Sequence, residues 1–389
     1  MSSAAFRRGR FRPAIALTAL LATLGSAGPL GASSLEWRTE CVGYYTLRLP
    51  GDVEYAVQQP PLERRWQPKF VSGLGVLNTR FSVGLNGDAD ELSDIRISGD
   101  VSKGALPALA KARNSALQMD KEDRLRMADR SDDSPGMQKR LRSEAGQISF
   151  FEPLNGETVF ARFGEKGVEF DALIGTRIIS SGLYRAGTPQ QTIDGFLNRY
   201  RPRETFEVPT EPGVCLPYSF VAGESQPASV GISMRFKDRP DIVIYLHDGK
   251  DFTTLEPPPD AMAYVEREIR FGAFYGNRVT APLDGTSNQY HSVTIDGRRG
   301  VGTFALVTRN SKPGPEAINN SANNDQDWAY LAYVSADKAA TPGTSSDLVF
   351  KVERFGRFAK QSMTEHEFRN LVKTLAAGIK RRPGAWVQR

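Results

Sequence analysis

The chain has 389 residues, of which 40% are hydrophobic and 24% are charged, and this composition is typical of a globular protein. Lys and Arg total 50 and Asp and Glu total 45, but the first 33 residues contain four arginines and no acid, which leaves 46 basic and 45 acidic residues beyond them. A net charge this close to zero creates no long-range field for a polyanion, so nucleic acid is excluded as the expected partner.

The first 33 residues have the order of a secretory signal peptide. Four arginines up to Arg12 are followed by an apolar run, Ala14–Leu24, and then by small and turn-forming residues. A helix of this run, rising about 1.5 Å per residue, is too short for a hydrocarbon core about 30 Å thick. We therefore predict that residues 1–33 direct export to the periplasm and that the chain has no stable membrane anchor.

The length beyond the signal peptide, roughly 355 residues, suits two domains of average size. A proline-containing segment, Glu207–Gly213, has the composition of a short, stiff linker. We predict an N-terminal α+β domain over residues 35–208 and a C-terminal α+β domain over residues 212–389.

Both predicted domains begin with a strand that carries a cysteine. The aromatic-rich segment Cys41–Pro50 alternates like a strand, and Cys215–Val221 repeats its tyrosine three places after the cysteine. In an oxidising compartment the two cysteines form either a disulfide or two buried thiols, and the sequence leaves both alternatives open. The repeated order favours duplication of one unit over a chance likeness.

The rest of the N-terminal domain contains strands and two predicted helices. A long surface helix is expected over Leu106–Met127, where charged residues interrupt the apolar ones. Strands follow at Val168–Leu173 and Ile178–Leu183, and a helix capped by Thr188 continues to Tyr200.

The C-terminal domain is predicted to be richer in strands and to close with one helix. Its expected strands are Val230–Phe236, Ile242–His247, Val293–Ile295, Gly302–Thr308, Trp328–Val334 and Leu348–Arg354. Thr364 and Glu367 form a capping box before the final helix. Strands without regular βαβ alternation indicate an α+β fold of two related lobes, each a mostly antiparallel sheet with helices packed on one face.

Signatures of catalysis are absent from the sequence. His366–Glu367 begins like a zinc-protease helix, but Asn370 stands where the second histidine is required. Gly223-Glu224-Ser225-Gln226 is followed by Pro227, which prevents the tight turn into a helix that a nucleophile elbow requires. With three histidines in the whole chain, we expect no enzyme activity, no metal and no cofactor.

Two polar segments are candidates for contact with a partner, although each also suits a solvated loop. The partner-binding candidates are Asp88, Asp90, Glu91, Asp94, Asn319, Asn320, Asn323, Asp325 and Asp327. The acidic group lacks the spacing of a calcium loop. The asparagine-rich group falls in a long irregular segment, Pro313–Asp327, and loops of this length are often functional.

The opening of the exported chain resembles a known family. Glu40–Tyr45 with Leu49–Pro50, and in the second half Cys215, Ser229–Phe236 and Arg239–Ile242, are similar to the immunity proteins that neutralise type VI secretion lipase effectors, specifically the two-domain Tli class. The resemblance implies a periplasmic, non-enzymatic claw of two α+β domains that is monomeric when free. Such a protein binds a cognate phospholipase effector and clamps the lid over its active-site entrance.

Two other classes of function stay open on the sequence alone. An envelope hydrolase would need a nucleophile, and Ser225 or Ser233 near His247 is the best available candidate. A periplasmic solute-binding or scaffold protein would instead carry a small ligand. A test for ester or glycan turnover, or for a ligand retained through purification, distinguishes these classes from a lipase inhibitor.

Overall fold

The computed structural model describes residues 36–59, 67–70, 92–130, 134–164, 167–183, 189–223, 230–249, 260–271, 278–282, 290–308, 327–337 and 345–385. The predicted signal peptide, residues 1–33, lies outside these ranges. Within them, the helices are interspersed among strands that pair antiparallel, which confirms the predicted α+β class. None of the described helices has the length and apolar character needed to span a membrane.

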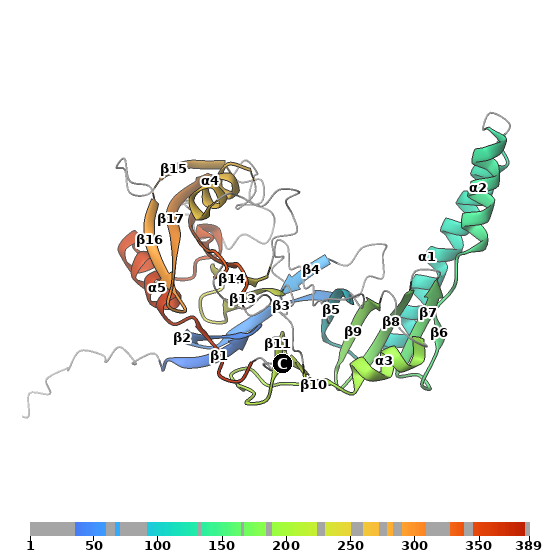
Figure 1. The fold of residues 1–389 in the computed structure, drawn as a ribbon, viewed down its shortest axis with the longest axis horizontal. Coiled ribbons are helices and arrows are strands. Elements are labelled where there is room, and N and C mark those ends of the chain that lie inside the picture. The colour runs from blue at the N-terminus through green and yellow to red at the C-terminus, as the bar shows by residue number, and fades with distance from the viewer. Residues whose placement is uncertain are drawn as a thin grey trace, which may run out of the picture. The chain divides into compact units, whose positions relative to one another are not determined.

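The largest sheet draws its strands from both ends of the chain (Figure 1). Its order is β15 (Arg278–Pro282), β17 (Arg298–Thr308), β18 (Asp327–Val334), β19 (Leu348–Arg354), β14 (Ile242–Asp248), β13 (Val230–Phe236), β3 (Val53–Gln59) and β4 (Gln67–Phe70), and β16 (Tyr290–Ile295) pairs with β17. The strands predicted at 230–236 and 348–354 are observed with the predicted bounds, because apolar residues occupy alternate positions along both segments.

Alternate residues of β18 face two different helices. Trp328 packs with its ring centroid 5.7 Å from Phe368 of α5 (Glu365–Ala377), and Tyr330 belongs to the same core, as alternation predicts. Tyr333 faces the other way and stacks at 4.0 Å on Tyr264 of α4 (Ala261–Phe271). The two faces of the sheet are therefore covered by different helices.

The sequence predicted one strand over Cys41–Pro50, and this prediction is wrong because the segment belongs to a hairpin of two strands. β1 (Arg38–Val42) and β2 (Tyr45–Leu49) pair antiparallel, and the chain reverses at Gly43, which has a φ of 61°. Likewise β11 (Gly213–Leu216) and β12 (Ser219–Ala222) replace the single strand predicted from Cys215. β10 (Tyr200–Pro202) pairs with β12, and β20 (Lys380–Arg381) pairs with β2.

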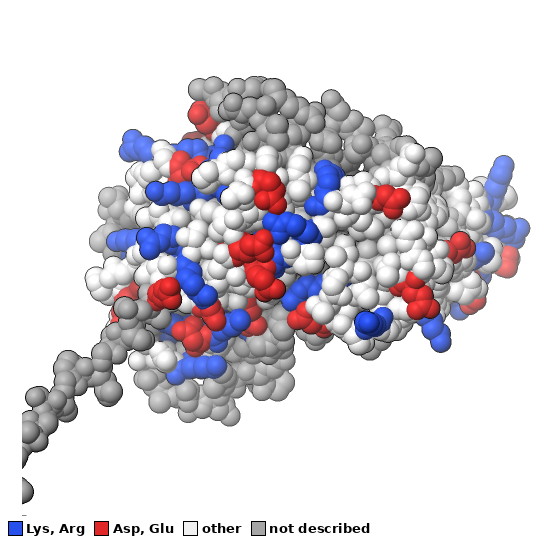
Figure 2. Space-filling model, turned by 90° about the horizontal axis from the view of Figure 1, so that it is seen from below, with Lys and Arg blue, Asp and Glu red and all other residues white. Residues whose placement is uncertain are grey.

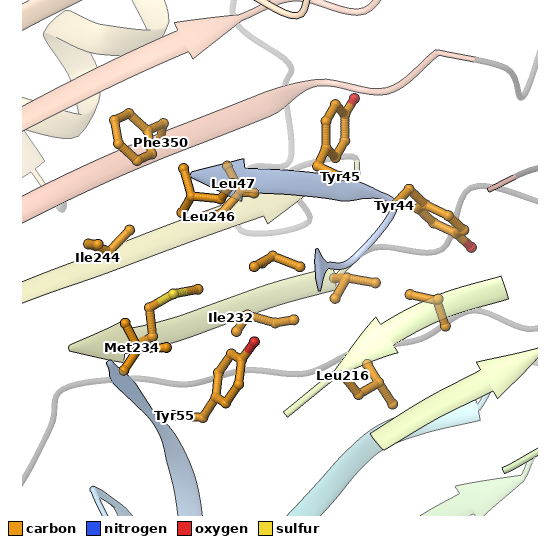
Figure 3. Close-up of a cluster of buried hydrophobic side chains, with 14 of the residues drawn as sticks. Tyr44, Tyr45, Leu47, Tyr55, Leu216, Ile232, Met234, Ile244, Leu246 and Phe350 are labelled. Atoms are coloured by element: carbon orange, nitrogen blue, oxygen red, sulfur yellow. The ribbon is translucent and has the colours of Figure 1, made fainter. Parts of the chain in front are cut away.

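One continuous hydrophobic core connects the hairpins with the large sheet (Figure 3). Leu47 of β2 lies close to Leu246 of β14, and Tyr55 of β3 lies beside Met234 of β13 (Figure 3). These residues are all buried, so the segment 36–59 contributes core side chains to a sheet built mainly from the second half of the chain. The division into domains at 35–208 and 212–389 stays a prediction.

A second sheet is made only of residues from the first half. Its order is β5 (Leu92–Asp100), β9 (Arg177–Leu183), β8 (Gly167–Ile174), β7 (Val159–Gly164) and β6 (Glu152–Pro153). The predicted helix is observed as α1 (Ala105–Ala128), whose Leu106 and Leu109 pack on Ile178 of β9. α2 (Pro135–Gly146) was not predicted, and α3 (Pro189–Leu197) is shorter than the helix expected up to Tyr200.

Candidate partner-binding surface

Most of the partner-binding residues predicted from the sequence lie outside the described part of the chain. This group contains Asp88, Asp90, Glu91, Asn319, Asn320, Asn323 and Asp325. Asp94 lies in β5. Asp327 starts β18 and is only 5% exposed. Its Oδ1 accepts a hydrogen bond of 2.8 Å from the backbone N–H of Gly356. This burial leaves little of Asp327 for contact with a partner.

Of the described residues weighed for a hydrolase, Ser233 has its side chain closed to solvent. Ser225 lies outside the described residues, and Ser233 is buried in β13 opposite Tyr245 of β14. His247 pairs with Gly231 instead, two residues away along the strand. Among the described residues, no group of three or more His, Cys, Asp or Glu side chains is placed to hold a metal ion.

The two cysteine hairpins meet and are covalently joined. Cys41 and Cys215 form a disulfide with their Cα atoms 5.8 Å apart, which is the bridged alternative of the two that the sequence left open. Gly43 and Cys215 also exchange two backbone hydrogen bonds of 2.9 Å each. The disulfide spans 174 residues and fixes the first hairpin to the segment that follows the predicted linker.

A fully buried ion pair lies beside the disulfide. Arg203 Nη1 is 2.6 Å from Glu40 Oε1, and both side chains are closed to solvent. The Arg203 guanidinium also donates to the carbonyl oxygens of Cys41 and Glu207, while the Glu40 carboxylate accepts from the backbone N–H of Phe206 at 2.5 Å. These bonds compensate the desolvation of both charges.

The hydroxyl of Tyr55 completes this network. It accepts a bond of 3.2 Å from Arg203 Nη2 and donates to the Cys41 carbonyl at 3.3 Å. Burial, aided by the Glu40 charge, raises the pKa of Tyr55 well above its usual value, so the phenol stays protonated and keeps its donor role. The side chains of Glu40, Tyr55 and Arg203 are all buried, and we infer that their network stabilises the fold.

The predicted linker is held by the C-terminal end of the chain. Arg382 Nη1 donates to the carbonyls of Pro209 at 2.7 Å and Glu211 at 2.8 Å, and its Nη2 donates to Gly213 at 2.6 Å. Gly213 has a φ of 149°, and a Cβ there would lie 2.3 Å from the Val221 carbonyl oxygen. The segment is therefore rigid through tertiary contacts as well as through its prolines.

Another cluster of polar side chains, which includes Tyr45 of β2, Asp248 of β14 and Arg298 of β17, connects these three strands. Burial raises the pKa of Asp248 to about 7, although the Ser346 hydroxyl donates to this carboxyl group. Arg298 donates to the Tyr45 hydroxyl at 3.0 Å and to the Ser346 carbonyl at 2.7 Å. A buried acid with a raised pKa is a frequent mark of an active site, but this one is enclosed in the core.

The largest exposed apolar side chains gather on one helical hairpin. We call α1 and α2 together the arm; Figure 1 shows their far halves extending past the edge of the five-stranded sheet. Within the described residues, six large hydrophobic side chains are strongly exposed, and four of them are on the arm: Met119 (51%), Leu125 (39%), Met127 (38%) and Met137 (44%). We call these four residues the arm patch.

One residue of the arm patch, Met119, also lines a groove along α1. The groove has a volume of about 670 Å³, and its lining includes Ala110, Asn114, Met119, Phe150 and Phe160. Met119 belongs to both features, and the groove lining also includes the polar side chains of Lys111, Gln118 and Glu122. Sequence reasoning missed this site because α1 was recognised only as a cover for a sheet and α2 was not recognised at all.

Elsewhere the described surface carries both signs of charge. Figure 2 shows Lys and Arg interspersed with Asp and Glu on one face, with no large field of a single sign. This distribution agrees with the near balance of 46 basic and 45 acidic residues beyond position 33. The described residues on this face offer no stripe of cations for a nucleic acid backbone.

A model of a known protein family matches a short part of the chain. Residues 207–261 match the model described as the Tle cognate immunity protein 4 C-terminal domain. The matched segment contains the Arg382-bound carbonyls, β11 to β14 and Cys215. This match confirms the resemblance to Tli-type immunity proteins that the sequence analysis stated. No curated protein matches the sequence.

Three solved structures are also similar to the chain. Immunity protein TplEi of T6SS from Pseudomonas aeruginosa, complexed with "L" peptide, is 14% identical with a TM-score of 0.44, covering 90% of this chain and 99% of that one. Its apo structure is 15% identical with a TM-score of 0.45, covering 89% and 97%. The structure of the Tle4–Tli4 complex is 14% identical with a TM-score of 0.44, covering 90% and 99%.

Proposed function

We propose that this chain is a periplasmic immunity protein that binds and neutralises a type VI secretion phospholipase effector. The observation that carries the proposal is the match of residues 207–261 to the C-terminal domain of Tle cognate immunity proteins. The chain acts by stoichiometric binding and performs no reaction itself. Its partner is the cognate lipase, and it needs no cofactor.

Two features support a periplasmic location. Residues 1–33 have the pattern of a secretory signal peptide. Cys41 and Cys215 form a disulfide, and disulfides persist in oxidising compartments such as the bacterial periplasm. An effector delivered to the envelope of a neighbouring cell would meet the inhibitor there.

Inhibition is proposed to work by clamping the lid over the lipase active-site entrance. A lipase must expose an apolar entrance before lipid enters, so a protein that holds the lid shut blocks turnover without touching the catalytic residues. Self-protection needs a very tight complex, which requires a large interface with a few buried apolar or arginine anchors. The two predicted domains would supply such an interface from two sides.

The decisive experiment is a titration of phospholipase activity. Candidate phospholipases encoded near this chain's gene are each assayed on phospholipid vesicles with increasing amounts of the purified mature chain. We expect activity to fall linearly and to vanish near one equivalent. A lipase that stays active with excess inhibitor contradicts the proposal, as does hydrolysis of phospholipid by the purified chain alone.

The acidic residues near position 90 are proposed to steer the effector. Replacing Asp88, Asp90, Glu91 and Asp94 together with Ser is expected to slow association strongly at low salt and weakly at high salt, because screening removes long-range attraction. Stopped-flow mixing measures the rate. An unchanged rate at low salt would identify these residues as solvated surface only.

A further inference from the structure

We propose that the disulfide between Cys41 and Cys215 is a redox gate, which makes the chain a competent inhibitor only after its two thiols have been oxidised outside the cytosol. Burial of both sulfur atoms then keeps the bond closed. The inference rests on the proposed function and deepens it, because it names the chemical event that must precede binding of the phospholipase.

The hairpin of β1 and β2 joins other described strands through few backbone contacts. β2 pairs with β20 at two positions, and one bridge connects Gly43 with Cys215. The chain contains two cysteines, so the disulfide is the one covalent link between this hairpin and a distant part of the sequence. Without the disulfide, the position of the hairpin depends on noncovalent contacts alone.

Side chains of the same hairpin fill the main hydrophobic core. Tyr44, Tyr45, Leu47 and Leu49 are at most 1% exposed, and they belong to one cluster with Phe350 of the large sheet. Separation of the hairpin would therefore expose apolar side chains of both sheets to water. The stability of the described fold as a whole depends on keeping this hairpin in place.

The buried ion pair beside the disulfide does not replace it. Arg203 holds Glu40 and also donates to the carbonyl of Cys41, so the pair specifies which two segments meet. Removing two charges from water costs about as much as their attraction returns, and such a pair contributes little net stability. When the cross-link is absent, separation returns both charges to water, which favours the open hairpin.

The length of the loop that the disulfide closes makes the cross-link important. Its two ends are 174 residues apart in the sequence. The entropy that a cross-link removes from the unfolded chain grows with the logarithm of this length, so the stabilisation lies near the upper end for one disulfide. Proteins are stable by a small margin. We therefore expect the reduced chain to populate an open form with a detached hairpin.

Oxidation of the two thiols is an exchange with an external disulfide, either of a protein oxidant or of glutathione. One cysteine thiolate attacks a sulfur of the oxidant, forms a mixed disulfide and releases one thiol. The thiolate of the other cysteine then attacks the sulfur of the first and releases the second thiol. The chain's two thiols are oxidised, the external disulfide is reduced to two thiols, and the two protons pass to them.

The exchange must precede closure of the fold. Cys41 and Cys215 are both 0% exposed, and they pack with Phe220 and Val208. An oxidant reaches the sulfurs only while this cluster is open, and a reductant is excluded once it has closed. Two cysteines allow a single pairing, so no later rearrangement is required.

The redox gate assigns inhibition to one compartment. Thiols stay reduced in the cytosol, whereas the periplasm is oxidising. A chain still in the cytosol would remain open and leave an effector made there free for secretion. Inhibition would begin in the compartment where the effector of a neighbouring cell arrives.

The test compares forms of the mature wild-type chain in one titration of the phospholipase. The reduced form is unfolded in urea with tris(2-carboxyethyl)phosphine and refolded in that reductant. The reoxidised form is the same sample after removal of the phosphine and addition of glutathione disulfide. Oxidised chain taken through urea without reductant is the matched control. The lipase alone is assayed in the reductant, and thiol titration in urea verifies the redox state of each form.

We expect the reduced form to inhibit with an apparent affinity at least about tenfold weaker, because only the closed fraction binds. The reoxidised form and the urea control should inhibit like untreated chain. Reduced chain that inhibits as well as oxidised chain overturns the redox gate and leaves the proposed function intact. Failure of the untreated oxidised chain to inhibit overturns the proposed function, and the redox gate with it.

A pair of exported variants gives the same comparison without refolding. Cys41→Ala with Cys215→Ala removes the cross-link, and Val221→Ala removes buried atoms from β12 but keeps the cross-link. We expect the double variant to inhibit at least about tenfold more weakly than wild type, or to be recovered unfolded, and Val221→Ala to inhibit nearly like wild type. Equal inhibition by the double variant and wild type, or equal losses in both variants, overturns the redox gate.

Reductant added to the folded, oxidised chain tests whether burial keeps the bond closed. We expect free thiols to appear at least about tenfold more slowly than in urea, because neither cysteine is exposed. Equal rates in the presence and absence of urea would show that the disulfide is accessible in the folded chain and would overturn this part of the inference.

Discussion

Arg203 and Glu40 face each other inside the protein, with Nη1 and Oε1 2.6 Å apart and neither side chain reaching solvent. They are 163 residues apart in sequence, and each also bonds to backbone groups of the other's segment. The pair thus fixes β1 against the turn that precedes the predicted linker, next to the disulfide that joins the same two regions.

The first prediction concerns this pair. Arg203→Met leaves the Glu40 carboxylate buried without a counter-charge, and we expect it to lower the free energy of unfolding by about 3–5 kcal/mol. Urea unfolding followed by fluorescence measures the loss. Adding Glu40→Gln should restore part of it, since the double variant no longer buries a charge. A double variant that is less stable by the sum of both single losses would contradict coupling between the residues.

The second prediction concerns the disulfide. Cys41→Ala with Cys215→Ala removes a cross-link that spans 174 residues, and the chain-entropy relation gives a loss of about 5 kcal/mol as an upper value. Thermal unfolding with and without dithiothreitol checks it. Reductant should destabilise the wild type towards the variant and leave the variant unchanged, and an equal response of both proteins would contradict the prediction.

The third prediction concerns pH. Burial raises the pKa of Asp248 to about 7 from the usual value of 3.8, so between these pH values the folded state keeps a proton that the unfolded state has released. Stability should therefore fall as the pH rises from about 4 to 7, by on the order of 3–4 kcal/mol for this group at about 1.4 kcal/mol per pKa unit.

Asp248→Asn isolates this contribution. Urea unfolding at several pH values measures the free energy of unfolding of both proteins. As the pH rises, the value for the variant should increase relative to the value for the wild type, and the difference should level off above about pH 7. A difference that is constant across pH 4–8 would show that Asp248 does not titrate in this window.

The fourth prediction concerns the start of α5. Thr364 accepts a hydrogen bond from the Glu367 backbone, and the Glu367 side chain bonds back to the Thr364 N–H. Thr364→Ala should lower the free energy of unfolding by about 1 kcal/mol. Lys373→Ala, at an exposed position inside the same helix, should change it by less than about 0.5 kcal/mol. Chemical denaturation compares the two variants.

The fifth prediction compares two glycines. Gly213→Ala places a Cβ against the Val221 carbonyl in a backbone conformation that L-residues rarely adopt, and we expect a loss of about 2 kcal/mol or more. Gly136→Ala places a Cβ in open space within α2, where alanine favours the helix by about 0.5–1 kcal/mol. Thermal unfolding should give a lower melting temperature for Gly213→Ala and a higher one for Gly136→Ala than for the wild type.

Local patterns in the sequence identified the regular elements best. β19 was predicted with its observed bounds because its apolar run ends at charged residues, and α5 was placed by its capping box. The reversal at Gly43 was missed because it lies inside a continuous apolar run. α4 was missed although Asp260 caps it by accepting from Ala263 N–H, a signal that Tyr264 and Val265 could have completed.

The candidate site was less accessible to sequence reasoning. α2 begins at Pro135 after polar residues, which suggested the end of a helix rather than the start of another. Met119 and Met137 lie on helices, where an apolar residue is normally expected to face a core. Only the structure shows that these two side chains are exposed and lie outside the hydrophobic core. The pairing of Glu40 with Arg203 has no local signal at all, since a tertiary contact creates it.

The pairing of β20 with β2 has a consequence for biosynthesis. Tyr45 opposes Arg381, and the neighbouring Arg382 binds three carbonyl groups of residues 209–213. The hairpin of β1 and β2 therefore lacks a neighbouring strand, β20, until residues 380–381 have been synthesised. The sheet of β1, β2 and β20 therefore cannot close before residues 380–381 are available, and a truncation that removes residues 380–389 would leave that edge of β2 unpaired.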